Sequence, residues 1–430
     1  MTTVSSVLPR SSVPGRWLET PWIYTVWCIV AAFGTYACMY GFRKPFTAGT
    51  YLETETGWNM KAWLVTAQVL GYALSKFIGI KVIAEMPRSR RALVLLGLIG
   101  AAELALLFFA LTPSPYNTAW LFCNGLSLGL VFGLVLGFVE GRRMTELFVA
   151  GLCASFILAD GFTKSVGAAL LAGGVPERWM PFTAGLVFLG PLVVFVWMLR
   201  QIPPPSDSDI AARSARAPMT GTERLAMVRR HGVRLFGIIF AYLLITVLRS
   251  VRADFAPEIW AGLGLGKQPA IFTQSELWVT LGVVVANGAV VLIPNNRRAF
   301  FTSLGLSAGG LALALFALVG IRTGIVSPFV FMVLLGVGMY VPYVAVHTTV
   351  FERLIALTRE RGNIGFLMYI ADSVGYVGYA GLMVTRSAFP VKESFLGFFL
   401  DLATILVVGA FVAVVLSWVL YARRAPQATE

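Results

Sequence analysis

The sequence predicts an all-α polytopic membrane protein, with twelve transmembrane helices in two six-helix pseudo-symmetric bundles. Hydrophobic residues make up 57% of the chain and charged residues only 13%, and the mean hydropathy is +0.78. A soluble domain cannot bury that much apolar surface, and the strands of a β-barrel would give shorter, alternating signals. The formal charge of +13 does not indicate nucleic-acid binding, because the basic residues lie in short tracts between apolar runs.

The apolar runs form two sets of six, separated by a polar segment. Each run has about 20 residues or more, enough to cross roughly 30 Å of hydrocarbon. The segment at 201–232 is rich in Pro, Ser and Arg and predicts a solvated linker, with a short interfacial helix from Thr222. We therefore expect a tail at 1–20, a bundle at 21–200, this linker, a bundle at 233–422 and a tail at 423–430. The runs cover 21–46, 61–84, 91–111, 117–139, 146–172, 180–199, 233–255, 274–293, 299–320, 326–351, 363–384 and 396–422.

Arginines mark one side of the predicted membrane. They follow the second, fourth, eighth, tenth and twelfth runs and are frequent in the linker, whereas the opposite loops contain few basic residues. This pattern predicts that both termini are cytoplasmic, and we expect a bacterial inner membrane. The first residues lack the apolar core of a signal peptide. The four cysteines lie in or beside apolar runs, which predicts neither a disulfide nor a metal cluster.

A short motif recurs in the fifth run of each half. Asp160 and Asp372 each follow an alanine and each precede a Ser-Val-Gly triplet. Two parallel six-helix repeats with a substrate site between them are typical of secondary transporters. In the fourth run, glycines recur at every fourth position from Gly125 to Gly141, which predicts close packing against a neighbouring helix.

Two arginines lie inside apolar runs, Arg43 and Arg249, one near the start of each half. Burying a cation in a membrane costs roughly 3 kcal/mol or more, so such residues usually serve a site. Two of them in corresponding helices predict one polyvalent anion held between the halves. Tyr36 and Tyr40 share a helix face with Arg43. Alternatively, Arg43 lies near the end of its run and extends its charge to the membrane interface.

Other charged and phenolic residues belong to the same predicted site. Lys44 follows Arg43, and Tyr72 and Lys76 are four residues apart on one helix face. Together with the arginines they offer hydroxyls and cations suited to the oxygens of a phosphate.

The intramembrane carboxylates predict ion pairs or coupling groups. Asp160 and Lys164 are four residues apart and can pair within one helix, either structurally or with the substrate. Asp372 has no cation on its own helix, so we expect a partner on another helix, with Arg249 or Lys164 as candidates. Proton coupling is the alternative role for Asp372.

No catalytic or nucleotide-binding motif occurs in the sequence. A Walker motif, an HExxH pair and a GxSxG elbow are all missing. We therefore expect neither ATP-driven pumping nor an enzyme, and we predict no cofactor and no metal. Of the two histidines, His347 is expected to be a packed polar residue.

Several motifs resemble those of the organophosphate:phosphate antiporters of the major facilitator superfamily, which include glycerol-3-phosphate and hexose-phosphate transporters. Tyr-Gly-Phe-Arg-Lys-Pro-Phe stands at 40–46, Gly-Tyr-Ala-Leu-Ser-Lys-Phe-Ile-Gly at 71–79, and Leu-Arg at 248–249. The resemblance implies the major facilitator fold and a phosphate held by Arg43 and Arg249. The family's histidine in the fifth helix is absent here. The residues implied to assist the arginines are Lys44, Lys76, Tyr36, Tyr40, Tyr72, Tyr340 and Tyr376.

These observations predict a secondary active transporter that moves a small anionic, phosphorylated metabolite by alternating access, in exchange for inorganic phosphate. One alternative is a proton-coupled symporter of a neutral or carboxylate solute, which would use Asp160 or Asp372. A second alternative is a transporter-like sensor of sugar phosphates. The expected partners are the anion, inorganic phosphate or protons as coupling species, and the lipid bilayer. We expect a monomer and no nucleic-acid partner.

Overall fold

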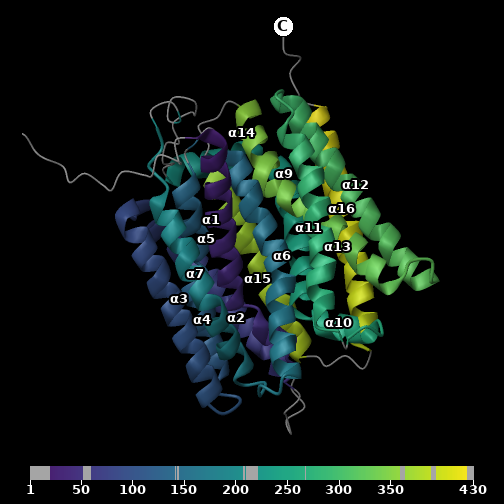
Figure 1. Cartoon of the computed structure of the whole chain (residues 1–430). Helices are drawn as coiled ribbons and strands as arrows, with labels where there is room; N and C mark the ends of the chain where they lie inside the picture. The colour runs from purple at the N-terminus through teal and green to yellow at the C-terminus, as the bar shows by residue number, and fades with distance from the viewer. Residues whose placement is uncertain are drawn as a thin grey trace, which may run out of the picture.

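The computed structural model describes residues 20–51, 60–140, 145–206, 221–266, 268–358, 364–388 and 394–423, together with Arg142 and Asp209. Over these ranges every regular element is a helix, and the long helices run alongside one another through the molecule (Figure 1). Most of the two predicted tails and the middle of the predicted linker lie outside the described residues.

Each of the twelve predicted runs coincides with helical structure. In the first half the elements are α1 (Pro21–Gly41), η2 (Pro45–Ala48), α2 (Met60–Glu85), α3 (Arg88–Leu111), α4 (Thr118–Leu128), α5 (Val131–Val139), α6 (Thr145–Ala172) and α7 (Met180–Gln201). In the second half they are α9 (Gly221–Asp254), α10 (Ala256–Gly262), α11 (Ala270–Val291), α12 (Asn296–Thr323), α13 (Pro328–Ala345), η3 (Val346–Val350), α14 (Phe351–Thr358), α15 (Ile364–Ala388) and α16 (Phe395–Ala422).

Nine helical segments within the described part of the chain are long and apolar enough to cross a membrane. The three other long helices, α2, α11 and α15, carry the buried charged residues Lys76, Glu276 and Asp372. Polar residues in membrane helices usually face the interior of the bundle, and these three do.

Three of the predicted spans are interrupted. In the fourth run the break lies between α4 and α5, at Gly129 and Leu130. α1 ends at Gly41, and Pro45, which has no backbone N–H, begins the separate 3-10 turn η2. Arg43 therefore lies between two helical elements. In the tenth run, Pro342 lies inside α13, and the helix then changes to the π-helical turn η3 before α14.

The seventh run extends further than the sequence suggests. α9 begins at Gly221 and continues without a break to Asp254. The short interfacial helix predicted from Thr222 is therefore the first part of one long helix.

The helices pack as two groups that meet along two seams. Helices up to α7 contact mainly one another, and so do helices from α9 onward. Between the groups, α2 packs against α15 and α6 packs against α11. These seams place α2, α6, α11 and α15 at the centre of the molecule, where α6 lies beside α11 in Figure 1.

The predicted glycine-rich face of the fourth run allows α2 and α4 to touch. A Cβ atom at Gly125 would lie 2.0 Å from the Gln68 carbonyl oxygen, and one at Gly71 would lie 2.1 Å from the Phe122 carbonyl oxygen. No side chain fits at either position, so this packing depends on glycine. The close contact brings Asn124 of α4 beside Gln68 of α2.

Candidate functional site

Arg43 is held at the end of α1 by side chains from α2 and α4. The amide Nε2 of Gln68 donates to the Arg43 carbonyl at 3.0 Å and to Asn124 Oδ1 at 2.8 Å. Asn124 Nδ2 in turn donates to the Phe42 carbonyl at 3.0 Å. These bonds satisfy carbonyls that the broken helix leaves free. They fix the backbone from which the Arg43 side chain projects.

The Arg43 guanidinium lies on an aromatic ring rather than at the interface. Its side chain is buried, with 4% exposure, and its central carbon is 3.8 Å from the centroid of the Tyr72 ring. The Tyr40 ring lies on another side at 5.9 Å. Arg43 therefore does not extend into solvent, and the alternative of an interfacial arginine is not supported by its burial.

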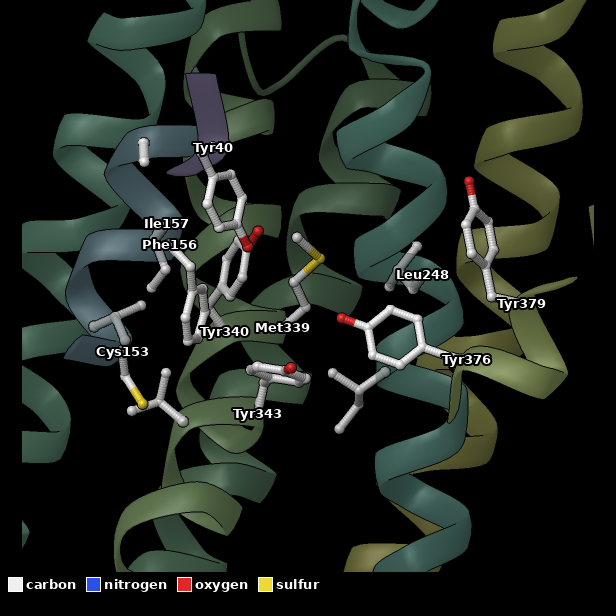
Figure 2. Packing of buried hydrophobic residues seen from close by; sticks show 14 of the residues in the cluster. Tyr40, Cys153, Phe156, Ile157, Leu248, Met339, Tyr340, Tyr343, Tyr376 and Tyr379 are labelled. Atoms are coloured by element: carbon white, nitrogen blue, oxygen red, sulfur yellow. The ribbon is translucent and has the colours of Figure 1, made fainter. Parts of the chain in front are cut away.

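Arg249 on α9 has similar surroundings in the second half. It is 7% exposed, and its Nη2 donates to the Tyr376 hydroxyl at 3.4 Å. Its central carbon is 4.7 Å from the Tyr343 ring centroid. Figure 2 shows Tyr40, Tyr340, Tyr343 and Tyr376 in the same part of the buried interior.

Aromatic rings connect the two arginines across the seam between α2 and α15. The Tyr72 and Tyr376 ring centroids are 5.3 Å apart, so the ring under Arg43 touches the ring whose hydroxyl binds Arg249. Lys76 Nζ lies 5.2 Å from the Tyr376 centroid. We call the following residues the arginine–tyrosine cluster: Arg43, Arg249, Tyr40, Tyr72, Tyr343 and Tyr376.

The two other tyrosines of the predicted site lie beside this cluster. The Tyr36 hydroxyl is 3.5 Å from the Tyr72 hydroxyl, and the Tyr36 ring packs edge-on against Tyr40. The Tyr340 ring centroid is 6.3 Å from that of Tyr343. Both tyrosines are buried.

Neither arginine of the cluster has a carboxylate partner within the described ranges. No ion pair joins Arg43 or Arg249 to an acid, and the Nε atom of each is buried without a hydrogen-bond partner. A buried donor without a partner costs about 1–3 kcal/mol, more when the group is charged. The geometry therefore leaves two cationic donors available for an anion.

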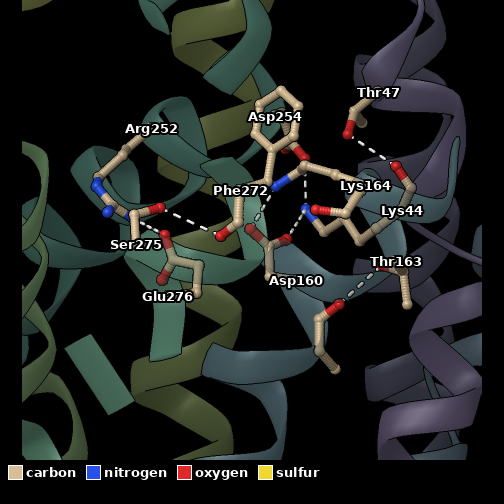
Figure 3. Close-up of polar contacts among 12 residues, drawn as sticks. Lys44, Thr47, Asp160, Thr163, Lys164, Arg252, Asp254, Phe272, Ser275 and Glu276 are labelled. Carbon is tan, nitrogen blue, oxygen red and sulfur yellow. Dashed lines mark hydrogen bonds and ion pairs between the residues drawn. The ribbon is translucent and has the colours of Figure 1, made fainter. Parts of the chain in front are cut away.

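Lys44 belongs to a different group of residues, shown in Figure 3. Its Nζ pairs with Asp254 at the end of α9 and lies 3.7 Å from Asp160 Oδ1. Asp160 also forms the predicted intrahelical pair with Lys164. We call Lys44, Asp160, Lys164 and Asp254 the lysine–carboxylate network. The sequence groups Lys44 with Arg43, whereas the structure places its side chain in this network.

Asp372 pairs with Lys76 across the α2–α15 seam and accepts a hydrogen bond from the Tyr242 hydroxyl. Neither Arg249 nor Lys164, the candidate partners predicted from sequence, binds it, so that prediction is wrong. Arg249 instead faces Tyr376 and Tyr343, and Lys164 is held by Asp160.

The buried charges between the two helix groups do not balance. Among the described residues, two more cations than carboxylates lie there, and the excess corresponds to the two arginines of the cluster. Glu103 and Arg142, also buried, lie within the first helix group, against Gly185 and the Pro203 carbonyl. The buried cations are Arg43, Lys44, Lys61, Lys76, Lys164, Arg249 and Arg252, and the carboxylates are the buried Asp160, Asp254, Glu276 and Asp372 together with the half-buried Glu258, which pairs with Lys61.

Several residues around the site are not identified by sequence reasoning. Tyr343 stacks on Tyr242 with centroids 5.0 Å apart, and the Tyr379 hydroxyl donates to Asp254 Oδ2 at 2.9 Å. Helical spacing was the available signal, because Tyr343 and Tyr379 each follow a predicted site tyrosine by one turn. The ion pairs Lys61–Glu258 at 2.6 Å and Arg252–Glu276 at 2.7 Å carry no comparable sequence signal.

No group of three or more potential metal-binding side chains occurs in the part of the chain that the structure describes. Cys28, Cys38, Cys123 and Cys153 are all free.

Comparison with known proteins places the chain in a family. Residues 45–424 match the model of a family of unknown function, DUF5690. The chain belongs to this family. No curated protein sequence matches it significantly.

Solved structures similar to this DUF5690 protein show which fold it has. A D-xylose-proton symporter matches with a TM-score of 0.63 and 14% identity, over 92% of this chain and 97% of that one. The nucleoside transporter NupG matches with a TM-score of 0.58 and 15% identity, over 92% and 99%. A bacterial homologue of the iron transporter ferroportin matches with a TM-score of 0.56 and 17% identity, over 94% and 99%. The predicted major facilitator fold is thus confirmed, and with nine apolar helices in the part that the structure describes the chain is an integral membrane protein.

Proposed function

We propose that this protein is a secondary active transporter that moves a small, doubly charged, phosphorylated metabolite by alternating access. Its site is the arginine–tyrosine cluster, with Lys76, Tyr36 and Tyr340 at its edge. Inorganic phosphate is the proposed exchange partner, and a bacterial inner membrane with both termini cytoplasmic is the proposed location. We also propose that α2, α11 and α15 span the membrane and that the protein works as a monomer.

One observation carries this proposal: two buried arginines, one from each half, have no carboxylate partner among the described residues. A phosphate monoester carries a charge of about −1.5 to −2 at neutral pH, which matches the excess of two buried positive charges. The planar guanidinium binds two phosphate oxygens at once, and the free Nε atoms of Arg43 and Arg249 are suitable donors. Fold similarity at 14–17% identity supports transport in general and not this cargo.

The placement of the arginines suggests how binding would be coupled to movement. Arg43 belongs to the first helix group and Arg249 to the second, so an anion between them attracts both groups. Lys44–Asp254 and Lys61–Glu258 also join the two groups. Both ion pairs are formed in the described structure. They have to break when the two helix groups separate at the end of the molecule where Lys44 and Lys61 lie.

The test is exchange of radiolabelled phosphate by proteoliposomes that contain unlabelled phosphate. We expect exchange by the wild type and its loss in Arg43→Ala and Arg249→Ala. Arg322→Gln is a matched control, because Arg322 is an arginine at an exposed site, 44% accessible, paired with Asp401. Equal exchange by all four proteins would refute the arginine site, and no exchange by folded wild type would refute phosphate as a cargo.

A proton-coupled symporter of a neutral or carboxylate solute is the second candidate, and the buried Lys76–Asp372 pair is the observation that favours it. Uptake of such a solute that follows a pH gradient, without phosphate exchange, would support it. A sensor would bind phosphate tightly without any flux, and an enzyme would form a product.

A further inference from the structure

Four buried side chains form a continuous polar chain that starts beside the arginine–tyrosine cluster. Lys76 Nζ binds Asp372 Oδ2, and Asp372 Oδ1 accepts a hydrogen bond from the Tyr242 hydroxyl. The same hydroxyl lies 2.7 Å from His347 Nε2. The side chains of Lys76, Asp372 and His347 are at most 10% exposed, and Tyr242 is 1% exposed. This series of hydrogen-bonded side chains therefore connects the arginine–tyrosine cluster to η3 through the protein interior.

The surroundings of Asp372 contain one close cationic partner and several weaker polar neighbours. Lys76 supplies the ion pair, whereas the His347 Nε2 atom is 3.7 Å from Asp372 Oδ1. α14 also packs against α15, and its Arg353 donates to Asn296 of α12 at 2.7 Å. The titratable and charged groups that interact with Asp372 are Lys76 of α2, Cys153 of α6, Tyr242 of α9, Tyr343 of α13, His347 of η3 and Tyr376 of α15 itself. The charged residues of α14 are Glu352 and Arg353.

The hydrogen-bond directions in this chain can be assigned from the number of protons available. Tyr242 has one hydroxyl proton and donates it to Asp372, so its contact with His347 requires His347 Nε2 to be the donor. In a neutral imidazole, Nδ1 then has no proton. Nδ1 is buried and has no hydrogen-bond partner among the described residues. It is therefore an unoccupied proton acceptor at the end of the chain.

We propose that Asp372 is a proton-binding site, loaded through His347 and Tyr242 when the transported anion draws Lys76 away from it. This inference rests on the proposed anion site and names its coupling ion. Lys76 lies over the Tyr376 ring, whose hydroxyl binds Arg249, so an anion between the arginines lies near Lys76. Once Lys76 turns to the anion, Asp372 is a buried carboxylate without a counter-charge. Burying such a charge costs several kcal/mol, and protonation removes the cost.

The proton transfer balances along the chain. When the helix groups separate and water reaches His347, a proton from the aqueous phase binds Nδ1. The Nε2 proton then moves to the Tyr242 oxygen, and the Tyr242 hydroxyl proton moves to Asp372 Oδ1. One proton passes from water to the carboxylate and no electrons are transferred. His347 ends neutral, with its proton on the other nitrogen. Each dianion thus travels with one proton, so a pH gradient drives its accumulation whenever the anion is taken up without an anion leaving in exchange.

Transport of inorganic phosphate in proteoliposomes separates this inference from the proposed function. Wild type should exchange phosphate without a gradient, and a pH difference of one unit should drive accumulation by up to about tenfold for one proton per anion. Asp372→Asn should keep exchange and lose the pH-driven accumulation. Tyr242→Phe and His347→Gln, which leave no charge unpaired, should keep exchange and slow accumulation. Tyr379→Phe is the matched control, because Tyr379 is a buried tyrosine of α15 that takes no part in the series of hydrogen bonds from Lys76 to His347.

The outcomes distinguish the two proposals. No exchange by folded wild type overturns phosphate as a cargo and, with it, this coupling. Exchange without pH-driven accumulation in the wild type, or accumulation that survives in Asp372→Asn, leaves the anion site standing and overturns the proton site.

Infrared spectroscopy tests the same inference without any ligand. Lys76→Gln removes the counter-charge of Asp372 permanently, so this variant should show a carboxylic-acid carbonyl band at neutral pH that wild type lacks. The band should disappear in the double variant Lys76→Gln/Asp372→Asn. If Lys76→Gln shows no such band, or if the band remains in the double variant, Asp372 does not take up the proton and the inference is wrong.

Discussion

The arginine–tyrosine cluster and the lysine–carboxylate network are both buried between the two helix groups, yet their charges are neutralised differently. In the network, Lys44 pairs with Asp254 and Lys164 pairs with Asp160. In the cluster, the side-chain neighbours of Arg43 and Arg249 that the structure describes are tyrosine rings and a tyrosine hydroxyl. Arg43 and Lys44 are adjacent in sequence, so one backbone position separates the two environments.

This difference indicates different roles for the two regions. A buried ion pair balances its own charge, and removing one member leaves the other uncompensated. A buried arginine without an acid already carries that cost, which an incoming anion would remove. We therefore expect substitutions in the network to affect mainly stability and substitutions in the cluster to affect mainly anion binding.

The largest expected effect is a loss of stability in Asp254→Asn. This change leaves Lys44 buried without its main counter-charge, at a cost of about 3–5 kcal/mol. Chemical unfolding in mixed micelles measures it. The double variant Lys44→Met/Asp254→Asn removes both charges and should recover most of the loss. If the single variant is as stable as wild type, the network is not a structural ion pair.

The next effect concerns anion binding in Arg43→Ala and Arg249→Ala. Loss of one member of a buried, hydrogen-bonded charge pair costs about 2–5 kcal/mol, so phosphate affinity should fall by roughly thirtyfold or more. Equilibrium binding of radiolabelled phosphate measures this. Arg43→Lys keeps the charge without the planar fork and should bind with intermediate affinity. If either alanine variant bound phosphate with wild-type affinity, the arginine–tyrosine cluster would not be the anion-binding region that distinguishes it from the lysine–carboxylate network.

A smaller effect is expected for Tyr376→Phe, which removes the hydroxyl that accepts from Arg249 and keeps the ring that contacts Tyr72. One hydrogen bond to a charged group contributes about 1.5–3 kcal/mol at best, and the 3.4 Å length favours the lower end. Phosphate affinity should therefore change by about tenfold. Because the hydroxyl orients Arg249 and does not neutralise it, a complete loss of binding would show that Tyr376 itself contacts the anion.

The smallest effect is expected for Arg322→Gln, which breaks an ion pair with 44% and 60% exposed side chains. Exposed pairs contribute about 0–1 kcal/mol. Unfolding free energy and phosphate exchange should both stay close to wild type. A large loss in either measurement would show that burial does not separate important from unimportant ion pairs in this protein.

The fold could be predicted because hydropathy and run length depend on the bilayer and not on helix contacts. Helical periodicity also paired Asp160 with Lys164 on α6. It failed for Arg43, because α1 ends at Gly41 and the helix face of Tyr36 and Tyr40 does not continue to Arg43. Contacts between helices could not be predicted in this way. Lys76 rather than Arg249 meets Asp372, because α2 packs against α15 at that level.

Local breaks in the helices were also beyond sequence periodicity. α1 ends before Arg43, which changes the direction of Lys44 relative to a continuous helix and places its side chain beside Asp254. Tyr242 and Tyr343 enter the site because the rings of α9 and α13 stack. The sequence does not show which buried cations lack a carboxylate partner, because the pairing depends on how the helices pack against one another.

Thermal unfolding of the purified protein with increasing phosphate tests the central claim most directly. A ligand that binds only the folded state raises the unfolding midpoint, and the midpoint continues to rise as the ligand concentration increases above its Kd. We predict that phosphate raises the midpoint of wild type and leaves those of Arg43→Ala and Arg249→Ala unchanged, while all three proteins are similarly stable without it. Equal stabilisation of the wild type and both variants by phosphate would contradict the assignment of the two arginines as the anion site.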